Sequence, residues 1–292
     1  MNEGCQKSTG KAKKIKAPDM ILMDSCPVCG SDLIENYIET NLTNFFFPVS
    51  EEIIHKVKKE PFTLNICMQC SHVFQTNIEK NLLNLIYKEF YNHYNLDTSI
   101  EFQLVYRDRT INFLKNIISV GENQKALDIG CGEGTYFSEF RKMGFDCYGI
   151  EPSPKSEIAK QKNPDAVISN DFFNNFETNI FGTSFDVILM NWVLEHIEDI
   201  EDFFDKLKAY IKKGTTLFIQ VPDLDYYIEH NMPLFYVHEH INYFSAQTLC
   251  LLLIRKGFKI LDVSKGDSPA LLVAGEYMGI EQKTILQNKD QI

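Results

Sequence analysis

Short apolar runs alternate with amphipathic segments along most of the chain. Runs of strand length occur at residues 126–129, 147–150, 166–168, 185–190, 216–221, 259–263 and 271–274. Between them, apolar residues recur at helical spacing over 99–120, 135–142, 152–161, 203–211 and 246–256, and a further helix is predicted over 79–91. This alternation predicts an α/β domain built on a parallel sheet with helices on both faces.

Three glycines follow the first strand of this series. Gly130, Gly132 and Gly134 permit positive φ angles and let the backbone approach a ligand closely. The spacing is Asp128-x-Gly-x-Gly-x-Gly, which differs from the G-x-G-x-x-G turn that binds a dinucleotide pyrophosphate. A carboxylate before the turn would repel a diphosphate. It suits a cationic ligand instead.

A second acid follows the next strand. Glu151 lies seventeen residues beyond Gly134 and is placed to accept hydrogen bonds from both hydroxyls of a ribose. The glycine spacing and the two acids resemble the class I S-adenosylmethionine-dependent methyltransferases. In that family the E/D-x-G-x-G-x-G loop wraps the amino-acid end of the cofactor, and the acid that ends the second strand holds the ribose. The resemblance implies S-adenosylmethionine as cofactor and a Rossmann-like sheet.

The resemblance assigns further residues to the cofactor pocket. In this fold an acid or amide after the third strand meets the adenine amino group, which places Asp171 there; a helix N-cap is its alternative role. Asn191 and His196 follow the fourth strand, near the reacting end of the site. His196 could act as a base, but in relatives a similar N-x-x-L-E-H segment shapes the pocket. Tyr136, behind the glycine loop, is assigned to the same pocket.

Two C-x-x-C pairs precede this domain, with thirty-seven residues between them. Four thiolates match the tetrahedral coordination of a structural zinc ion and leave no open position for catalysis. A redox role is disfavoured because neither pair opens a helix after a strand in a βαβ unit. We therefore predict a zinc-binding module over residues 21–90, with an intervening hairpin or loop, whose ligands are Cys26, Cys29, Cys67 and Cys70.

Charge and composition narrow the range of partners. The net charge is −11, and the lysine-rich residues 1–16 contribute +4, so the remainder carries −15. An acidic body argues against a nucleic-acid surface. Residues 1–20 are predicted to be a disordered basic tail, and residues 281–292 are assigned to a C-terminal tail. Without a signal peptide or a long apolar run, we expect a cytoplasmic protein with no membrane partner, and the sequence indicates no oligomeric state.

A long loop over residues 223–244 lies between the fifth strand and the last helix, and loops of that length are usually functional. It contains Tyr236, His238, Glu239 and His240. A histidine with a carboxylate beside it can take a proton from a substrate. Because alternate residues of an extended segment project oppositely, only one histidine would face the pocket. A divalent ion bound by the two histidines and the glutamate is one alternative, and a polar loop that satisfies its own backbone is another.

The order of the parts resembles the zinc-containing sugar methyltransferases over about residues 21–275. That group includes C-methyltransferases acting on nucleotide-linked deoxysugars in bacterial polysaccharide and antibiotic pathways. Its Tyr-His-Glu-His run maps the base onto His240 and the acidic companion onto Glu239. The family tyrosine falls at Val237, with Tyr236 one residue earlier.

Another departure concerns the substrate. The relatives carry a G-G-S-x-R segment and a further C-terminal domain, whereas this sequence has Gly266-Asp-Ser-Pro-Ala and ends at Ile292. Transfer to a hydroxyl of a nucleotide-activated sugar for surface polysaccharide or a related glycan, in a domain over 91–280, is then the simpler expectation. C-methylation of a keto-deoxysugar is the alternative. A nicotinamide-dependent oxidoreductase is disfavoured by the glycine spacing, and a non-catalytic scaffold by the intact acids and His240.

Overall fold

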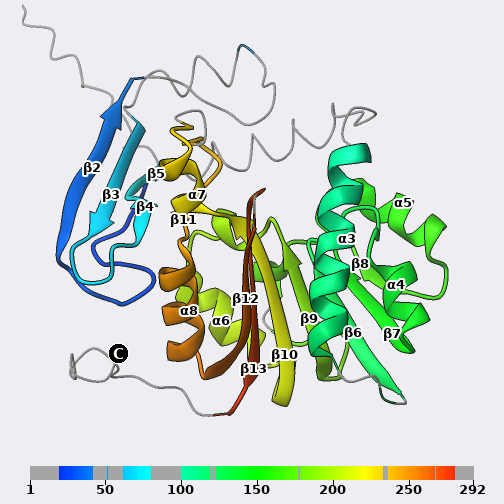
Figure 1. Cartoon of the computed structure of the whole chain (residues 1–292). Helices are drawn as coiled ribbons and strands as arrows, with labels where there is room; N and C mark the ends of the chain where they lie inside the picture. Colours follow the sequence, from blue (N-terminus) through cyan, green and yellow to red (C-terminus); the bar gives the residue numbers. More distant parts are fainter. Residues whose placement is uncertain are drawn as a thin grey trace, which may run out of the picture.

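The structure, a computed structural model, describes residues 20–41, 51, 62–79, 100–118, 121, 123–176, 178–232, 236–266 and 268–279. Figure 1 shows a large central sheet and a smaller sheet on the far side of helix α8 (Ala246–Arg255). The helix predicted over 79–91 lies outside the described residues, apart from its first position. None of the helices in the described part of the chain is both long and apolar enough to cross a bilayer.

The central sheet has seven strands in the order β12-β13-β10-β9-β6-β7-β8. Neighbours from β10 to β8 are parallel, and β13 runs antiparallel to β10 and β12, so the sheet is mixed. All seven predicted strands form, and the prediction of a Rossmann-like α/β domain is confirmed. The strands are β6 (Gln124–Ile129), β7 (Phe145–Ile150), β8 (Val167–Ser169), β9 (Phe185–Asn191), β10 (Ile211–Pro222), β12 (Phe258–Gly266) and β13 (Ser268–Tyr277).

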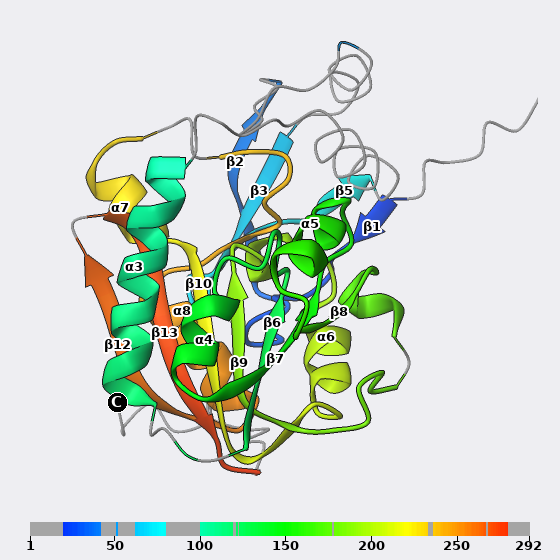
Figure 2. The same cartoon turned by 90° about the vertical axis from the view of Figure 1, so that its right-hand side faces the viewer.

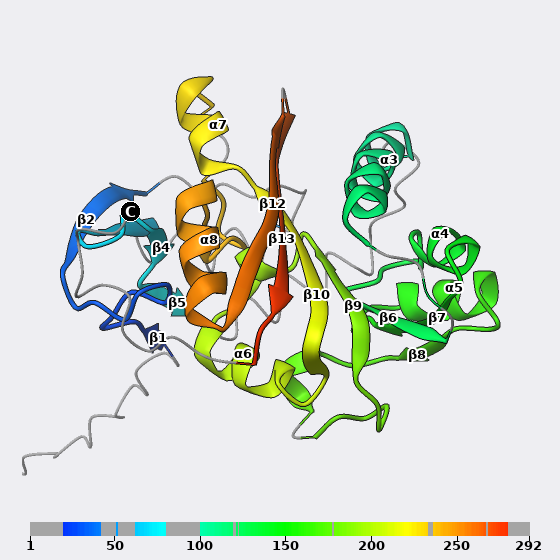
Figure 3. The same ribbon diagram turned by 60° about the horizontal axis from the view of Figure 1, so that its bottom comes forward.

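Helices cover both faces of this sheet (Figures 2 and 3). Ala126 of β6 packs with the helices on one face, while its neighbour Leu127 belongs to the core on the other. This follows from the alternation of side chains along a strand. The first face carries α3 (Ile100–Ile117) and α4 (Phe137–Lys142), the second carries α6 (Ile200–Leu207) and α8, and α5 (Lys155–Lys162) lies beside β8.

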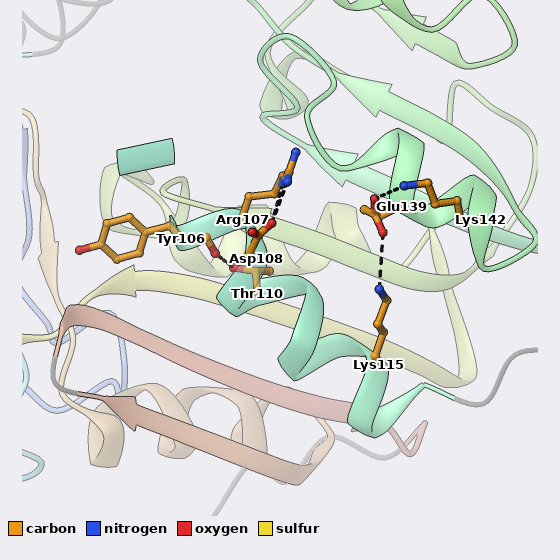
Figure 4. Close-up of polar contacts among 7 residues, drawn as sticks. All are labelled: Tyr106, Arg107, Asp108, Thr110, Lys115, Glu139 and Lys142. Atoms are coloured by element: carbon orange, nitrogen blue, oxygen red, sulfur yellow. Dashed lines mark hydrogen bonds and ion pairs between the residues drawn. The ribbon is translucent and has the colours of Figure 1, made fainter. Parts of the chain in front are cut away.

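Helix α3 is held mainly by burial of its apolar side against the sheet, including the fully buried Leu114. Figure 4 shows an ion pair from Lys115 to Glu139 of α4, with 3.5 Å between nitrogen and oxygen. Such exposed pairs contribute about 0–1 kcal/mol, so they add little to the packing. On its other side, Arg109 donates hydrogen bonds to backbone and hydroxyl oxygens at the turn from β12 to β13.

The predicted helix over 203–211 is too long. Helix α6 ends at Leu207, and Ile211 begins β10, where it pairs with Phe185 of β9. Lys212, Lys213 and Gly214 accordingly lie within β10. Pairing with β9 therefore outweighs the helical spacing of these residues. Tyr210 and Ile211 pack in the core beside the sheet, and the register of β10 against β9 shifts between Ile211 and Thr216.

The segment predicted as a loop over 223–244 contains regular structure as well. It begins with α7 (Leu224–Glu229) and ends with β11 (Asn242–Tyr243). Asp223 caps α7 by accepting a hydrogen bond from the backbone of Asp225 at 3.1 Å. Strand β11 belongs to the smaller sheet.

The smaller sheet has the order β11-β4-β3-β2, and β11 pairs antiparallel with β4. The N-terminal part of the chain is thus joined by a strand to the segment that contains His240. The sheet also lies against α8 (Figure 3), whose Arg255 donates a hydrogen bond to the carbonyl of Val28. Its other strands are β2 (Ile34–Thr40), β3 (Phe62–Cys67) and β4 (Val73–Gln75), and β1 (Met20–Leu22) pairs separately with β5 (Asn77–Glu79).

The N-terminal cap of α8 provides a test of the fold. Ser245 Oγ accepts from Thr248 N at 3.2 Å, and Thr248 Oγ1 accepts from Ser245 N at 3.0 Å. Ser245→Ala should lower the free energy of unfolding by about 1 kcal/mol, measured by urea titration, because a helix N–H loses its partner. Thr178→Ala, at an exposed position outside any helix, is the control; equal effects of the two substitutions would contradict this account of the cap.

Candidate active site

The glycine loop between β6 and α4 is shaped by close packing on two of its glycines. All three have positive φ angles, 77° at Gly130, 53° at Gly132 and 75° at Gly134. A Cβ atom would lie 2.5 Å from Val193 Cγ2 at Gly130 and 2.6 Å from Asn163 Nδ2 at Gly134. At Gly132 it would meet nothing within 4 Å. The loop therefore packs tightly at its ends and leaves open space at its centre, where a ligand can approach the backbone.

The two predicted acids lie side by side at the strand ends. Glu151 accepts hydrogen bonds from Gly132 N at 2.8 Å and from Ser153 N at 2.9 Å, which ties it to the glycine loop. Asp128 is 1 % exposed, and neither of its carboxylate oxygens has a hydrogen-bond partner among the described residues. Burial, with a smaller contribution from Glu151, raises the pKa of Asp128 well above its usual value.

The next two strand ends carry further polar groups that lack partners. Asn191 of β9 and Gln220 of β10 are register partners. Within the described chain, the amide nitrogen and oxygen of the Asn191 side chain and the amide nitrogen of Gln220 are buried without a hydrogen bond. Only the Gln220 oxygen is satisfied, by the Thr110 hydroxyl at 2.5 Å. Because each such group costs about 1–3 kcal/mol, their gathering at one edge indicates a polar ligand that supplies the partners.

Gln220 was not among the predicted site residues. The available signal was an amide within the otherwise apolar end of a buried strand, Phe218-Ile-Gln-Val. Tyr136, which was predicted, precedes α4 on the same side of the sheet. Burial raises its pKa, and the nearby carboxylate of Asp128 acts in the same direction.

Asp171 has a local role in the structure. Its Oδ1 accepts hydrogen bonds from Phe172 N at 2.7 Å and from Asn175 Nδ2 at 2.6 Å. These contacts lie just before the short helix η2 (Phe173–Asn175), whose N-cap residue is Phe172 without a side-chain cap, so the alternative of Asp171 as N-cap is wrong. Contact of Asp171 with the adenine amino group stays a prediction.

His196 and His240 lie against each other. His196 ends the short helix η3 (Leu194–His196), which follows Val193. Its ring lies 5.0 Å from that of His240, and its Nδ1–H donates to the carbonyl of Glu239 at 2.8 Å. Burial lowers the pKa of His196 to about 4, and burial together with His196 lowers the pKa of His240 well below its usual value. Both imidazoles are therefore neutral at physiological pH.

Glu195, which was not predicted, completes this cluster. It is 1 % exposed, and its carboxylate has no hydrogen-bond partner among the described residues. Burial raises its pKa to about 8. One ligand atom each from Glu195, His196 and His240 lies within 4.8 Å of the others, so the three could hold a divalent cation or share a proton. Among the described residues, this cluster of possible metal ligands includes His240, but it includes neither His238 nor Glu239.

His238 and Tyr236 face different surroundings. The His238 ring packs against Phe62 of β3, with 4.7 Å between ring centroids. The hydroxyl of Tyr236 lies 3.5 Å from that of Tyr37 in β2. These two side chains contact the smaller sheet, whereas His240 contacts His196. A catalytic role for His238 and Tyr236 stays a prediction.

The four cysteines of the N-terminal pairs come together. The Sγ atoms are 3.6 Å apart for Cys26 and Cys70 and 3.4 Å apart for Cys29 and Cys67. All four lie within 4.8 Å of one another. Zinc–sulfur bonds of about 2.3 Å in a tetrahedron imply sulfur separations of about 3.8 Å, so this donor set fits a zinc ion.

The backbone around the two pairs repeats itself. Gly30 N donates to Cys26 O at 2.8 Å, and Ser71 N donates to Cys67 O at 2.7 Å. Gly30 and Ser71 both have positive φ, 75° and 65°. Hydrogen bonds from the neighbouring thiols, Cys26 first, lower the pKa of Cys29. Two matched turns with converging thiols are typical of a metal site.

Comparison with known proteins shows to which family the chain belongs. The model of the methyltransferase domain matches residues 80–263, more than half of the chain. The chain belongs to this methyltransferase family. The prediction of an S-adenosylmethionine-dependent methyltransferase is thereby confirmed, and with it the enzyme class; the sugar substrate and the zinc ion need separate support.

Curated relatives match over shorter segments. The chain is 33 % identical over 92 residues to the ubiquinone biosynthesis O-methyltransferase of Nitrobacter winogradskyi, covering 31 % of this chain and 35 % of the relative. The corresponding protein of Rhizobium etli is 31 % identical over 101 residues, covering 34 % and 41 %. The chain thus spans about two fifths or less of the length of these relatives.

Solved structures show the same fold. The PH0226 protein of Pyrococcus horikoshii superposes with a TM-score of 0.51 at 15 % identity, covering 65 % of this chain and 99 % of that one. A methyltransferase of Thermotoga maritima, described as a possible histamine N-methyltransferase, gives 0.50 at 18 % identity and covers 64 % and 97 %. At these identities the likeness concerns the fold alone.

Asp128→Asn tests whether the unpartnered carboxylate of Asp128 has a raised pKa and belongs to the cofactor site. Because the folded-state pKa is raised, the folded protein keeps a proton that the unfolded chain releases, so stability falls as pH rises from about 4 through the folded-state pKa. We expect the substitution to raise the unfolding midpoint at pH 8 and to flatten this pH dependence. It should also weaken S-adenosylmethionine binding in calorimetry about tenfold or more, since a buried anion no longer attracts the cation.

Asp146→Asn, at an exposed position of β7, is the matched control and should change neither quantity. Unaltered affinity in Asp128→Asn would remove Asp128 from the cofactor site. An unaltered pH dependence of stability would contradict the raised pKa.

Proposed function

We propose that the protein transfers a methyl group to a hydroxyl of a nucleotide-activated sugar used for surface polysaccharide or a related glycan, with His240 as the general base. The sugar assignment rests on the order of the cysteine pairs, the glycine loop and the His-Glu-His segment. Transfer to oxygen is supported by the relatives, which are named O-methyltransferases. The acidic charge of the chain favours a small-molecule acceptor over a nucleic acid.

The unpartnered polar groups at the strand ends fit the cofactor. S-adenosylmethionine supplies a methyl group activated by a positively charged sulfur. Asp128 offers a buried carboxylate for the cationic part, and Glu151 offers oxygens at the tip of β7 for ribose hydroxyls. Asn191 and Gln220 offer amide groups whose hydrogen bonds are otherwise unmade. The open space over Gly132 lets the backbone take part.

The observation that carries the proposed mechanism is the placement of His240. It lies against His196, at the end of the segment whose Val193 packs on the glycine loop, so it is close to the cofactor side of the sheet edge. Burial lowers its pKa, so the imidazole is in the unprotonated form that a general base requires. General base catalysis of this kind contributes about 10²–10⁴ to the rate. The side chain of the buried Glu195 lies within 4.8 Å of His240 and, once ionised, would stabilise the resulting imidazolium. Glu239 precedes His240 in the chain, and its role as acidic companion stays part of the proposal.

His240→Ala should retain S-adenosylmethionine binding and lose most of the turnover, because the proton acceptor is removed while Asp128 and Glu151 remain. Turnover is measured as S-adenosylhomocysteine formed with a panel of nucleotide-sugars, and NMR of the product locates the new methyl group. The matched control is His230→Ala on the exposed end of α7, which should leave the rate unchanged.

Each outcome decides between assignments. Full turnover in His240→Ala would remove His240 as the base. A methyl group on carbon would favour the keto-deoxysugar alternative. A rate that depends on added divalent cation would assign Glu195, His196 and His240 to a metal. Reaction with intermediates of ubiquinone biosynthesis but with no sugar would replace the sugar assignment.

We also propose that Cys26, Cys29, Cys67 and Cys70 hold one structural zinc ion. Metal analysis of the purified protein should find one zinc per chain. Cys70→Ser should lose the ion and lower the thermal midpoint, since a structural zinc contributes to folding directly. Cys250→Ser in α8 is the control and should keep the zinc. Protein that is free of zinc yet equally stable would contradict the proposal.

A further inference from the structure

One residue of the smaller sheet holds the backbone that carries His240. Gln75 ends β4 and is only 4 % exposed. Its backbone N–H donates to the carbonyl of Ile241 at 2.9 Å. Its side-chain amide nitrogen donates to the carbonyls of His240 at 2.5 Å and His238 at 3.0 Å, and lies 3.5 Å from that of Val237. Four carbonyls within five consecutive residues therefore converge on Gln75.

The remaining carbonyl of this segment is held from the opposite side. Glu239 O accepts from the His196 ring, and Ile241 N donates to Glu195 O at 2.8 Å. The segment over 237–241 is thus clamped between β4 of the smaller sheet and η3 of the methyltransferase domain. Because His240 lies between two anchored neighbours, its imidazole has little freedom to move relative to His196.

Other contacts also join the smaller sheet to the chain directly after this segment. Strand β11 pairs with β4 directly after the segment, with Asn242 opposite Phe74. The Asn242 side chain accepts at 3.3 Å from His72 and donates to the carbonyl of Ile197 at 2.8 Å. His72 and Gln75 both follow closely on Cys70, the last of the four cysteines. The hairpin closed by the second cysteine pair is therefore the one that reaches the segment around His240.

We propose that Gln75 is a positioning residue, which sets the place of His240 and makes the cysteine-bearing module part of the catalytic apparatus. This inference rests on the proposed function, in which His240 takes the proton. A displacement of about 1 Å in a reacting group can lower a rate by about 10²-fold, so loss of the clamp should affect turnover far more than cofactor binding. The hydrogen bonds of Gln75 given above go to the segment over 237–241, which is separate from the cofactor residues Asp128 and Glu151.

Two substitutions separate the donated hydrogen bonds from simple packing. Gln75→Met keeps the length of the side chain and removes the amide donor. Gln75→Glu keeps the shape and faces the carbonyls with oxygen atoms. Gln161→Met, at an exposed position of α5, is the matched control. All variants are compared as full-length protein, with zinc content and circular dichroism as checks of folding.

The rate of S-adenosylhomocysteine formation with the nucleotide-sugar panel should fall about tenfold or more in both Gln75 variants, while S-adenosylmethionine affinity stays within about twofold. Amide hydrogen exchange should accelerate over residues 237–243 and remain unchanged in β6 and β7. In His240→Ala, a second change of Gln75→Met should cost nothing further, since both act through one group. This non-additivity is a readout that a merely structural role would not give.

The outcomes distinguish failure of the inference from failure of the proposed function. Full turnover in His240→Ala overturns the proposed function. Loss of turnover in His240→Ala with a normal rate in Gln75→Met overturns the positioning role alone. Parallel loss of rate and cofactor affinity in Gln75→Met also overturns it, because Gln75 would then support the fold as a whole. If no acceptor on the panel reacts, unchanged exchange over 237–243 overturns it.

Discussion

Buried polar groups that lack partners are the constraint on which the site depends. Asp128, Asn191 and Gln220 end adjacent strands and lie at one edge of the sheet, within the part of the chain that the structure describes. Each costs the fold stability, and Asp128 costs more because its ionisation is opposed by burial and by Glu151. A protein tolerates such groups where a ligand completes their hydrogen bonds. The packing of α3, α4, α6 and α8 on the two faces supplies the stability that makes this possible.

The second organising feature is the segment around His240, which contacts both the smaller sheet and the methyltransferase domain. Its carbonyls bond to Gln75 on one side and His196 on the other, and β11 carries the chain into the smaller sheet. The converging cysteines lie in turns of that same smaller structure. If both proposals hold, a zinc-stabilised hairpin influences the proton transfer at His240 without touching the cofactor.

Local patterns in the sequence were sufficient to predict much of the fold and part of the site. The apolar runs predicted every strand of the large sheet, and the glycine spacing with Asp128 and Glu151 predicted the family. The helix over 203–211 failed because its spacing also suits the start of β10, and the choice depends on pairing with β9. Glu195, Gln220 and Gln75 were not predicted, because their significance lies in contacts with residues distant in sequence. Polar residues within apolar runs were the only local sign.

The most direct test of the central claim is a crystal structure of the protein with S-adenosylhomocysteine. The account predicts that the ligand lies over Gly132, that its amino acid and ribose groups bond to Asp128 and Glu151, and that polar atoms of Asn191 or Gln220 gain partners. A ligand bound elsewhere, with the Asp128 carboxylate still lacking a hydrogen bond, would contradict it.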